Sequence, residues 1–320
     1  MKWPCIYILC GVAAGTAAQQ TSSICTEPLT QPRNASLDAV VERATRDLAG
    51  PSVSWHAFMR GANLADRAVA VVRVRDAPGP PASTLVYLTT ACSPCHLTHL
   101  CACWPTALRQ NLLAETVWSN ALRQNLLAEA DVLMYAGCRG AAAPSTWVHA
   151  LAALPVRNVT LAWTRWNPGY QQGAMAAVMV AARKGWFDRY AWVLRANPDI
   201  RIEDASFLAA RLRKPSVAAV LVRCRPRAPS ICTDFFAARP SAFNHSAWGL
   251  SHKRNGRVNN ELSAFHIFRG AIEGGGATVW NVDRAFRTVR GRGCRVGGRG
   301  IYHDHALCRR PRVARGVAAT

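Results

Sequence analysis

The chain has 320 residues, half of them hydrophobic, and carries 39 Lys and Arg against 18 Asp and Glu, a formal net charge of +21. This composition provides enough apolar material for a core and excludes a disordered polycation, and the length suits one large domain or two small ones. Only four of the 39 cations are lysines, so we interpret part of the charge as a preference for arginine rather than as a nucleic-acid-binding surface.

The first twenty residues have the pattern of a secretory signal peptide. Lys2 precedes a short apolar stretch, and small residues suited to cleavage precede Gln19. We expect residues 1–18 to be removed and the protein to lie in the Golgi or ER lumen or to be secreted. If the segment stays uncleaved, it would anchor the protein in a membrane. Three N-glycosylation sequons fit this route, at Asn34, Asn158 and Asn244.

The rest of the chain is divided into a stem at 19–50, one folded domain at 51–310 and a basic tail at 311–320. A helix is expected within the stem at 37–48. Strands are expected at 67–75, 84–91, 131–135, 158–163, 190–196, 217–223 and 233–238. Helices are expected at 104–130, 144–154, 171–184, 204–212 and 259–272. This alternation predicts an α/β fold, a mostly parallel sheet flanked by helices on both faces.

One nonapeptide, ALRQNLLAE, occurs twice, at 107–115 and 121–129. At about 100° per residue, two copies fourteen residues apart present nearly the same face of a helix. We interpret this as a local duplication and assign it no function, because two copies do not make a repeat protein.

The segment 167–202 has the clearest pattern of a ligand site. A polar turn with a glycine opens a helix, and a buried strand then ends in Asn197-Pro198-Asp199. Open α/β sheets bind ligands at the carboxyl ends of their strands, where a carboxylate can hold a divalent cation together with substrate phosphates. The same tripeptide is also common as a plain turn.

Three further features favour the same chemistry. His303 and His305 lie two residues apart on an extended segment, so both imidazoles face one side, as metal ligands do. Asp234 stands at the start of a predicted strand. Glu261 lies in the first turn of a predicted helix, where the helix dipole favours a carboxylate, so a helix-start role also explains it.

Together these residues resemble a GT-A-type nucleotide-sugar glycosyltransferase, over 84–308 and most closely over 165–245. The likeness extends to a little-characterised branch of such proteins in algae and related eukaryotes. In that pattern, Asn197-Pro198-Asp199 takes the place of a metal-binding Asp-x-Asp motif, with Asn197 for the first Asp. The resemblance implies a sugar transfer from a nucleotide-sugar donor to a glycan or glycoprotein acceptor, with Mn2+ or Mg2+. We expect no nucleic-acid partner, because the chain is expected to be exported and contains no recognised nucleic-acid-binding module.

The resemblance also implies a role for each site residue. Asp199 with His303 or His305 would hold the cation. Glu261 and Asp234 are candidate bases if the reaction inverts the anomeric centre, and Glu261 lies where the pattern places that base. The donor pocket would be bordered by Asn167, Gly169, Gln172 and Gly173. Asn197 would also contribute to donor binding, and Arg195 would stabilise the diphosphate leaving group. Because Asn197 departs from the pattern, an alternative is a catalytically inactive GT-A-like protein that binds glycans or polyanions.

The twelve cysteines include two in the signal peptide, which leaves an even number in an oxidising compartment. The segment from Cys92 to Cys103, with its Cys-x-x-Cys spacing and histidines, is open to interpretation as a zinc knuckle. Behind a signal peptide we favour disulfides. The candidate pairs are Cys294 with Cys308 and Cys224 with Cys232.

Overall fold

A computed structural model describes residues 35–46, 48, 69–79, 81–105, 107–108, 130–138, 144–165, 170–202, 204–223, 229–247, 259–281 and 297–303. The expected signal peptide, the basic tail, most of the duplicated nonapeptide and the Cys294–Cys308 pair lie outside these ranges. Within them, no helix has the length and apolarity needed to cross a membrane. The division of the chain into stem, domain and tail stays a prediction.

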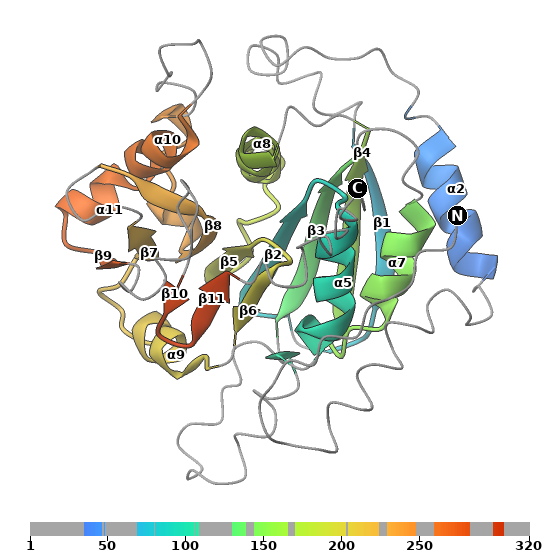
Figure 1. Ribbon diagram of the computed structural model, residues 1–320, viewed down its shortest axis with the longest axis horizontal. Coiled ribbons are helices and arrows are strands. Elements are labelled where there is room, and N and C mark those ends of the chain that lie inside the picture. The colour runs from blue at the N-terminus through green and yellow to red at the C-terminus, as the bar shows by residue number, and fades with distance from the viewer. Residues whose placement is uncertain are drawn as a thin grey trace, which may run out of the picture.

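An eight-stranded sheet forms the centre of the described structure, in the order β1-β4-β3-β2-β5-β8-β7-β9 (Figure 1). Its strands are β1 (Ala70–Asp76), β2 (Thr84–Thr90), β3 (Asp131–Gly137), β4 (Asn158–Thr164), β5 (Trp192–Ala196), β7 (Ala219–Arg223), β8 (Ile231–Ala238) and β9 (Ala277–Asn281). Four of its seven neighbouring pairs are parallel, and β1·β4, β5·β8 and β7·β8 are antiparallel. The expected α/β fold with a mostly parallel sheet is confirmed.

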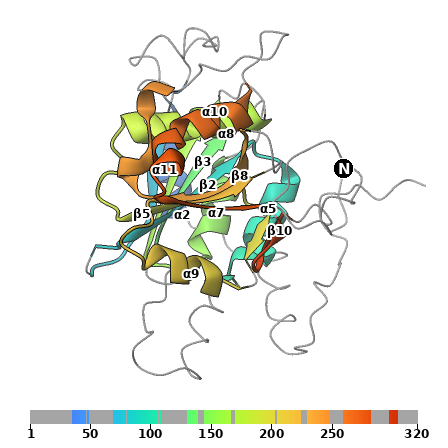
Figure 2. The same ribbon diagram turned by 90° about the vertical axis from the view of Figure 1, so that its left-hand side faces the viewer.

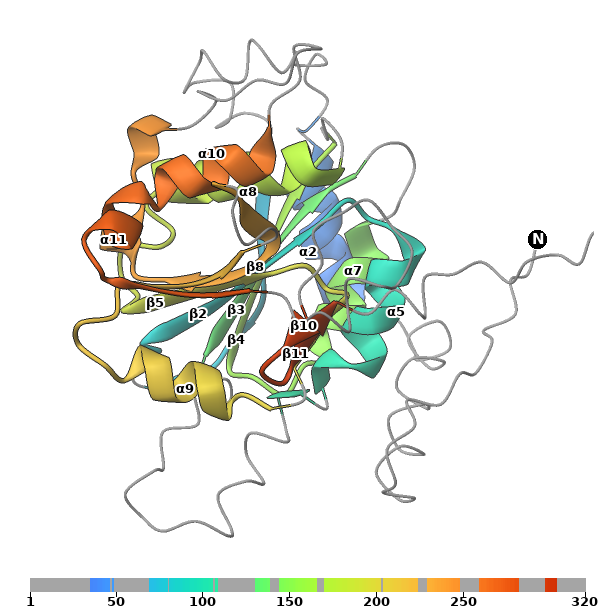
Figure 3. The same ribbon diagram turned by 60° about the vertical axis from the view of Figure 1, so that its left-hand side comes forward.

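Helices cover both faces of the sheet (Figures 2 and 3). One face carries α5 (Pro94–Ala102), α7 (Pro144–Ala152) and α9 (Ser206–Leu212), and the other carries α8 (Tyr170–Arg183), α10 (Asn260–Ile267) and α11 (Arg269–Glu273). α2 (Ala35–Arg46), in the expected stem, packs on α7 and β1. Both faces of β2 are therefore buried: Val86 and Leu88 join one apolar core, Leu85 and Tyr87 the other. Burial on both sides explains why the central strands are continuously apolar.

Two helices differ from the expectation. The helix expected at 259–272 is divided at Phe268 into α10 and α11. α5 was not predicted, because its segment was interpreted through its cysteines. Its start nevertheless carries ordinary helix signals: Ser93 caps it by accepting a hydrogen bond from the His96 amide, and Pro94 occupies its first turn.

A second, three-stranded antiparallel sheet was also missed. It has the order β10-β11-β6, with β10 (Gly297–Gly298), β11 (Ile301–His303) and β6 (Ile200–Ile202). His303 pairs with Ile200, so the C-terminal segment lies beside the turn that follows β5. Strands of two or three residues are too short to show a periodic pattern.

The cysteines form a disulfide that spacing did not indicate, Cys92–Cys138. Both residues follow neighbouring parallel strands, β2 and β3, whose carboxyl ends meet at one edge of the sheet. Cys95 is disulfide-bonded too, so the Cys-x-x-Cys thiolates are not available to zinc. The predicted Cys224–Cys232 pair is wrong: Cys232 is a free, buried thiol on β8, and its Sγ lies 3.7 Å from Asp234 Oδ2.

Candidate functional site

The candidate site lies where the strand order of the large sheet reverses. β2, β3 and β4 follow one another toward one edge, whereas β5 pairs with the opposite side of β2. In open α/β sheets, ligands bind outside the carboxyl ends of the strands at such a switch point. Thr89 and Thr90 end β2 at this point, and Asn197 and Asp199 follow β5 there.

Arg195 links β2 and β5 across the switch point. Its side chain is fully buried, and its Nη2 donates to Thr89 Oγ1 and to Asn197 Oδ1, each at 2.6 Å. The other side of Asn197 faces β8, where Nδ2 donates to Asp234 Oδ1 at 3.0 Å. Because a guanidinium faces its oxygen and a carboxylate faces its NH2 group, the amide of Asn197 has one favourable orientation.

His303 lies between the two carboxylates of the site. Its Nε2 is 2.9 Å from Asp199 Oδ2, and its Nδ1 is 3.3 Å from Asp234 Oδ2. His96, at the start of α5, places its Nε2 3.5 Å from the same oxygen of Asp199. We call this group the switch-point cluster: Thr89, His96, Arg195, Asn197, Asp199, Asp234 and His303.

Burial makes the charges of this cluster depend strongly on one another. Burial alone would lower the pKa of His303, but the hydrogen bonds and negative charges of Asp199 and Asp234 raise it to about 10. Burial would raise the pKa of both carboxyls, yet His303 holds each below its usual range, helped by His96 at Asp199 and by Arg195 at Asp234. At neutral pH the site therefore contains two carboxylates, an imidazolium and a guanidinium.

A buried tryptophan holds the turn that contains Asp199. Trp104 Nε1 donates to the carbonyl oxygen of Pro198 at 2.8 Å, and the indole is buried. The backbone of Asn197 extends the hydrogen bonding between β5 and β8, because its backbone N–H donates to the backbone carbonyl of Asp234 at 2.9 Å. The sheet and the core on its α5 side thus both determine where the Asp199 carboxylate lies.

The structure brings five of the expected site residues together: Arg195, Asn197, Asp199, Asp234 and His303. Glu261 lies in the first turn of α10, which packs on β8. Burial first, then the charge of Asp234 and, more weakly, that of Glu261 raise the pKa of the Cys232 thiol.

The structure does not test the four residues that the sequence places at the border of the donor pocket, nor His305. Gly173 and Gln172 lie in α8, which packs on β2, β3 and β8. Asn167, Gly169 and His305 lie outside the described residues. These assignments remain predictions.

His96 and Thr89 belong to the cluster but were not predicted as site residues. His96 was considered only as part of a zinc or disulfide segment. A usable signal was present, because a histidine in the first turn of a helix directly after a buried strand lies at the carboxyl edge of the sheet.

A carboxylate oxygen and an imidazole nitrogen together suit a divalent transition-metal cation such as Mn2+ better than Mg2+, which takes oxygen ligands. Asp199 Oδ2 and His303 Nε2 are 2.9 Å apart, which is close to the separation of two adjacent ligands on an octahedral ion with bonds of about 2.1 Å. Among the described residues, no three His, Cys, Asp or Glu side chains form a ready-made metal cage. Ions of the Mg2+ type do not need one, since phosphates and water complete their shell.

No protein-family model matches the sequence, and no curated protein matches it. Among solved structures, the chain is similar to the mannosyltransferase PcManGT from Pyrobaculum calidifontis in complex with GDP-Man and Mn2+, with 15% identity over 84% of this chain and 70% of that one (TM-score 0.35). It is also similar to mouse xyloside xylosyltransferase 1 in its apo form, with 11% identity over 72% of this chain and 99% of that one (TM-score 0.40). Both similarities are in the outline of the fold.

Proposed function

We propose that this chain is a glycosyltransferase that moves a sugar from a nucleotide-sugar donor to a glycan or glycoprotein acceptor, with Mn2+ or Mg2+, in the secretory pathway. The switch-point cluster is the observation that carries this proposal. It places a carboxylate and an imidazole that can share a cation at the edge of the sheet where α/β proteins bind ligands, with a buried guanidinium behind them.

The leaving group of such a donor is a nucleoside diphosphate, on which negative charge grows as the bond to the sugar breaks. Asp199 and His303 would hold the divalent ion, which when bound supplies positive charge to the β-phosphate. Arg195, which is hydrogen-bonded to Asn197, adds a fixed positive charge near the leaving diphosphate. Because the guanidinium is buried, its charge acts more strongly than it would in water.

Asn197 has a physical reason to replace the aspartate of the family pattern. Its Nδ2 lies 3.0 Å from Asp234 Oδ1 and donates to it. An aspartate in its place would put two carboxylates in contact, next to a third at Asp199, and like charges at this distance repel strongly. The amide instead keeps Asp234 in place without adding charge.

The two candidate bases differ in their surroundings. Asp234 already accepts hydrogen bonds on both oxygens, and its pKa is lowered by His303 against the effect of burial, so it is a weak base. We assign it the role of balancing charge. Glu261 is the candidate that would accept the proton of the acceptor hydroxyl if the reaction inverts configuration.

An inactive relative that binds glycans or polyanions is the second candidate. The burial of Asp199, of which 3% is exposed, favours it, because a donor reaches this carboxylate only where the surrounding residues give way. The two functions differ in one measurable property, the affinity for a nucleoside diphosphate.

The test is calorimetric titration of the purified protein with UDP and with GDP, each with and without Mn2+. We expect one nucleotide to bind in a Mn2+-dependent manner, and Asp199→Asn to weaken that binding by about tenfold or more, because a ligand to the cation is lost. Asp188→Asn makes the same chemical change at an exposed position before β5 and should bind like the wild type. A screen of sugar nucleotides for hydrolysis would then identify the donor.

Two results would contradict the proposal that this protein is a glycosyltransferase. One is that neither nucleotide binds the wild-type protein with Mn2+ present. The other is that Asp199→Asn binds as tightly as Asp188→Asn. If sulfated or acidic glycans bind in either case, the second candidate takes its place.

A further inference from the structure

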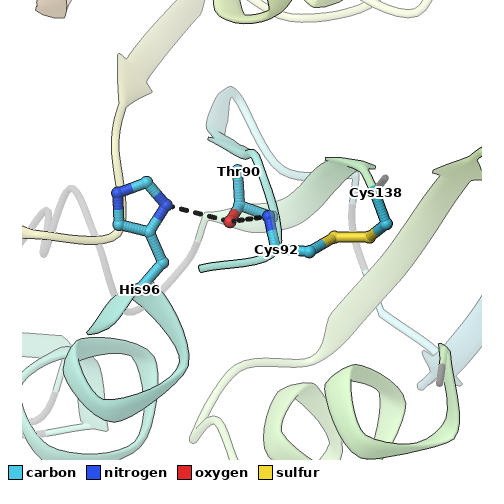
Figure 4. Close-up of a disulfide and its surroundings, with 4 residues drawn as sticks. All are labelled: Thr90, Cys92, His96 and Cys138. Atoms are coloured by element: carbon cyan, nitrogen blue, oxygen red, sulfur yellow. Dashed lines mark hydrogen bonds between the residues drawn. A yellow bond between two sulfur atoms is a disulfide. The ribbon is translucent and has the colours of Figure 1, made fainter. Parts of the chain in front are cut away.

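We propose that His96 is a positioning residue for Asp199, and that the Cys92–Cys138 disulfide holds His96 in place. This inference rests on the proposed function for the role of Asp199 and adds a residue to that site. Figure 4 shows the path that carries it: the disulfide, Thr90 at the end of β2, and the imidazole of His96.

Three contacts in sequence connect the disulfide to the carboxylate. The amide of Cys92 donates to Thr90 Oγ1 at 3.0 Å, and Thr90 Oγ1 lies 2.9 Å from His96 Nδ1. The other ring nitrogen, His96 Nε2, lies 3.5 Å from Asp199 Oδ2. Thr90 and His96 are both buried, so these contacts do not compete with bulk water.

These contacts favour a proton on Nε2 of His96. Thr90 Oγ1 already accepts from Cys92, and its own hydrogen is free to point at His96 Nδ1. A neutral imidazole that accepts at Nδ1 has its proton on Nε2, and that N–H faces the Asp199 carboxylate. In this arrangement the Thr90 hydroxyl donates to Nδ1, and the Nε2–H of His96 points toward Asp199 Oδ2, 3.5 Å away.

The disulfide holds the loop on which this geometry depends. Cys92 adopts a left-handed backbone conformation with a φ of 56°, which is unfavourable for a residue with a side chain. The bond to Cys138 attaches this loop to the carboxyl end of β3, and Ser93 and Pro94 start α5 directly after it. Only this short connection separates Thr90 from the first turn of α5, so the position of His96 follows that of Cys92.

Asp199 is therefore held from two sides by residues that are distant in the sequence. His303 of β11 and His96 of α5 both contact Oδ2. Where His303 shares a cation with Asp199, His96 remains as a donor that keeps the carboxylate oriented. Partners of this kind behind a metal ligand typically change metal affinity or activity by about 10- to 100-fold when removed.

The first test reads the proton position in the metal-free protein. Imidazole nitrogens labelled with ¹⁵N are observed by NMR at pH 7.5 with EDTA present, and the His96 signals are assigned from their loss in His96→Gln. We expect His96 to carry its proton on Nε2, and Thr90→Val to abolish this preference. Thr90→Ser should retain it. Thr98→Val is the matched control, because Thr98 lies exposed on the same helix and bonds only to the Pro94 carbonyl among the described contacts.

The second test measures binding. We expect His96→Leu to weaken Mn2+ binding, followed by the electron paramagnetic resonance of free Mn2+, by about tenfold. His96→Gln should stay within about threefold, because its amide can accept from Thr90 and donate to Asp199. In the presence of Mn2+, the affinity for UDP or GDP should follow the same order.

Several results would overturn the proposal. These are a proton on Nδ1 of His96 in the wild type, an unchanged tautomer in Thr90→Val, or equal Mn2+ affinities for His96→Leu and the wild type. Failure of the proposed function has a different signature: UDP and GDP do not bind the wild type, while the NMR result for His96 is unaffected.

Discussion

At the scale of the residue, the switch-point cluster is stable because its positive and negative charges compensate one another. Two buried carboxylates, Asp199 and Asp234, would repel each other and lose their hydration if nothing compensated them. His303 contacts both, Arg195 lies within the same network, and Asn197 donates rather than adds a third negative charge. Each of these residue types is needed for the others to be tolerated in this place.

The shifted pKa values predict how the stability of the metal-free protein depends on pH. His303 has a folded pKa of about 10, above its unfolded value of about 6.5, so its contribution is complete below pH 6.5 and is lost as the pH rises through 10. The two carboxyls have lowered pKa values, so theirs is present above about pH 4 and is lost as the pH falls further. Thermal unfolding in EDTA should show the highest melting temperature between about pH 5 and 6.5.

His303→Gln provides the control for this profile. We expect the variant to be less stable than the wild type at pH 6, and the difference to shrink toward pH 10. If the difference stays constant from pH 6 to pH 10, His303 is not charged in the folded protein.

The sequons differ at the same scale. Asn158 is half-buried and its Nδ2 donates to Asp131 Oδ1 at 2.7 Å, so a glycan on this nitrogen would have to be accommodated beside that contact. Asn244 is exposed, and the hydrogen bond from Ser246 of the same sequon goes to its Oδ1 and not to the nitrogen that would carry the glycan. In folded protein secreted by eukaryotic cells, peptide mass spectrometry should find a glycan at Asn244 and none at Asn158. Full occupancy of Asn158 would contradict the Asp131 contact.

At the scale of the element, short segments place the site residues. β6 and β11 have three residues each, yet their pairing sets His303 beside Asp199 across 104 positions of sequence. Trp104 holds the turn between β5 and β6 through a single hydrogen bond to the Pro198 carbonyl. Long elements form the frame, whereas these short ones determine the distances within the site.

Trp104→Phe tests this role of the turn. The variant keeps an aromatic ring in the core but leaves the buried Pro198 carbonyl without its donor and removes part of the side-chain volume. We expect a loss of about 2 to 4 kcal/mol in the free energy of unfolding, measured by urea denaturation. Mn2+-dependent nucleotide binding should weaken as well, because Asp199 is attached to the same turn. Unchanged binding would show that the turn keeps its shape without this bond.

At the scale of the whole molecule, the two faces of the sheet have separate tasks. The face with α5, α7 and α9 presents His96 and Trp104 to the site. The face with α8, α10 and α11 carries Glu261 and the predicted donor-pocket residues of α8. The Cys92–Cys138 disulfide joins the carboxyl ends of β2 and β3, and so the strand at the switch point is tied to its neighbour.

Removing this disulfide should lower the free energy of unfolding of the whole protein. Cys92 and Cys138 are separated by 46 positions, and closing a loop of this length contributes about 4 kcal/mol in the chain-entropy model. The double variant Cys92→Ser/Cys138→Ser should unfold at a lower urea concentration than the wild type under oxidising conditions, and this difference should disappear when both proteins are in reductant. Equal midpoints for oxidised wild type and variant would show that the bond adds no stability.

The amino-acid sequence by itself indicated the fold class, and with the family resemblance it named five residues that the structure brings together. Continuous apolar strands alternating with helices require a buried, mostly parallel sheet, and Asp199 directly after such a strand has to lie at its carboxyl edge. Local pattern is enough for the fold class and for the place of Asp199. It also indicated disulfides rather than zinc for Cys92 and Cys95, from the expected compartment alone.

Only the tertiary structure decided which distant residues meet. His96, the Cys92–Cys138 pair, the free thiol of Cys232 and the contact of His303 with two carboxylates all depend on strand order and on three-residue strand pairing. Contacts of this kind join segments dozens to hundreds of positions apart and leave no periodic trace in the sequence. They form because the packed sheet brings the ends of β2, β3, β5 and β8 to one edge, where burial then makes each charge depend on its partner.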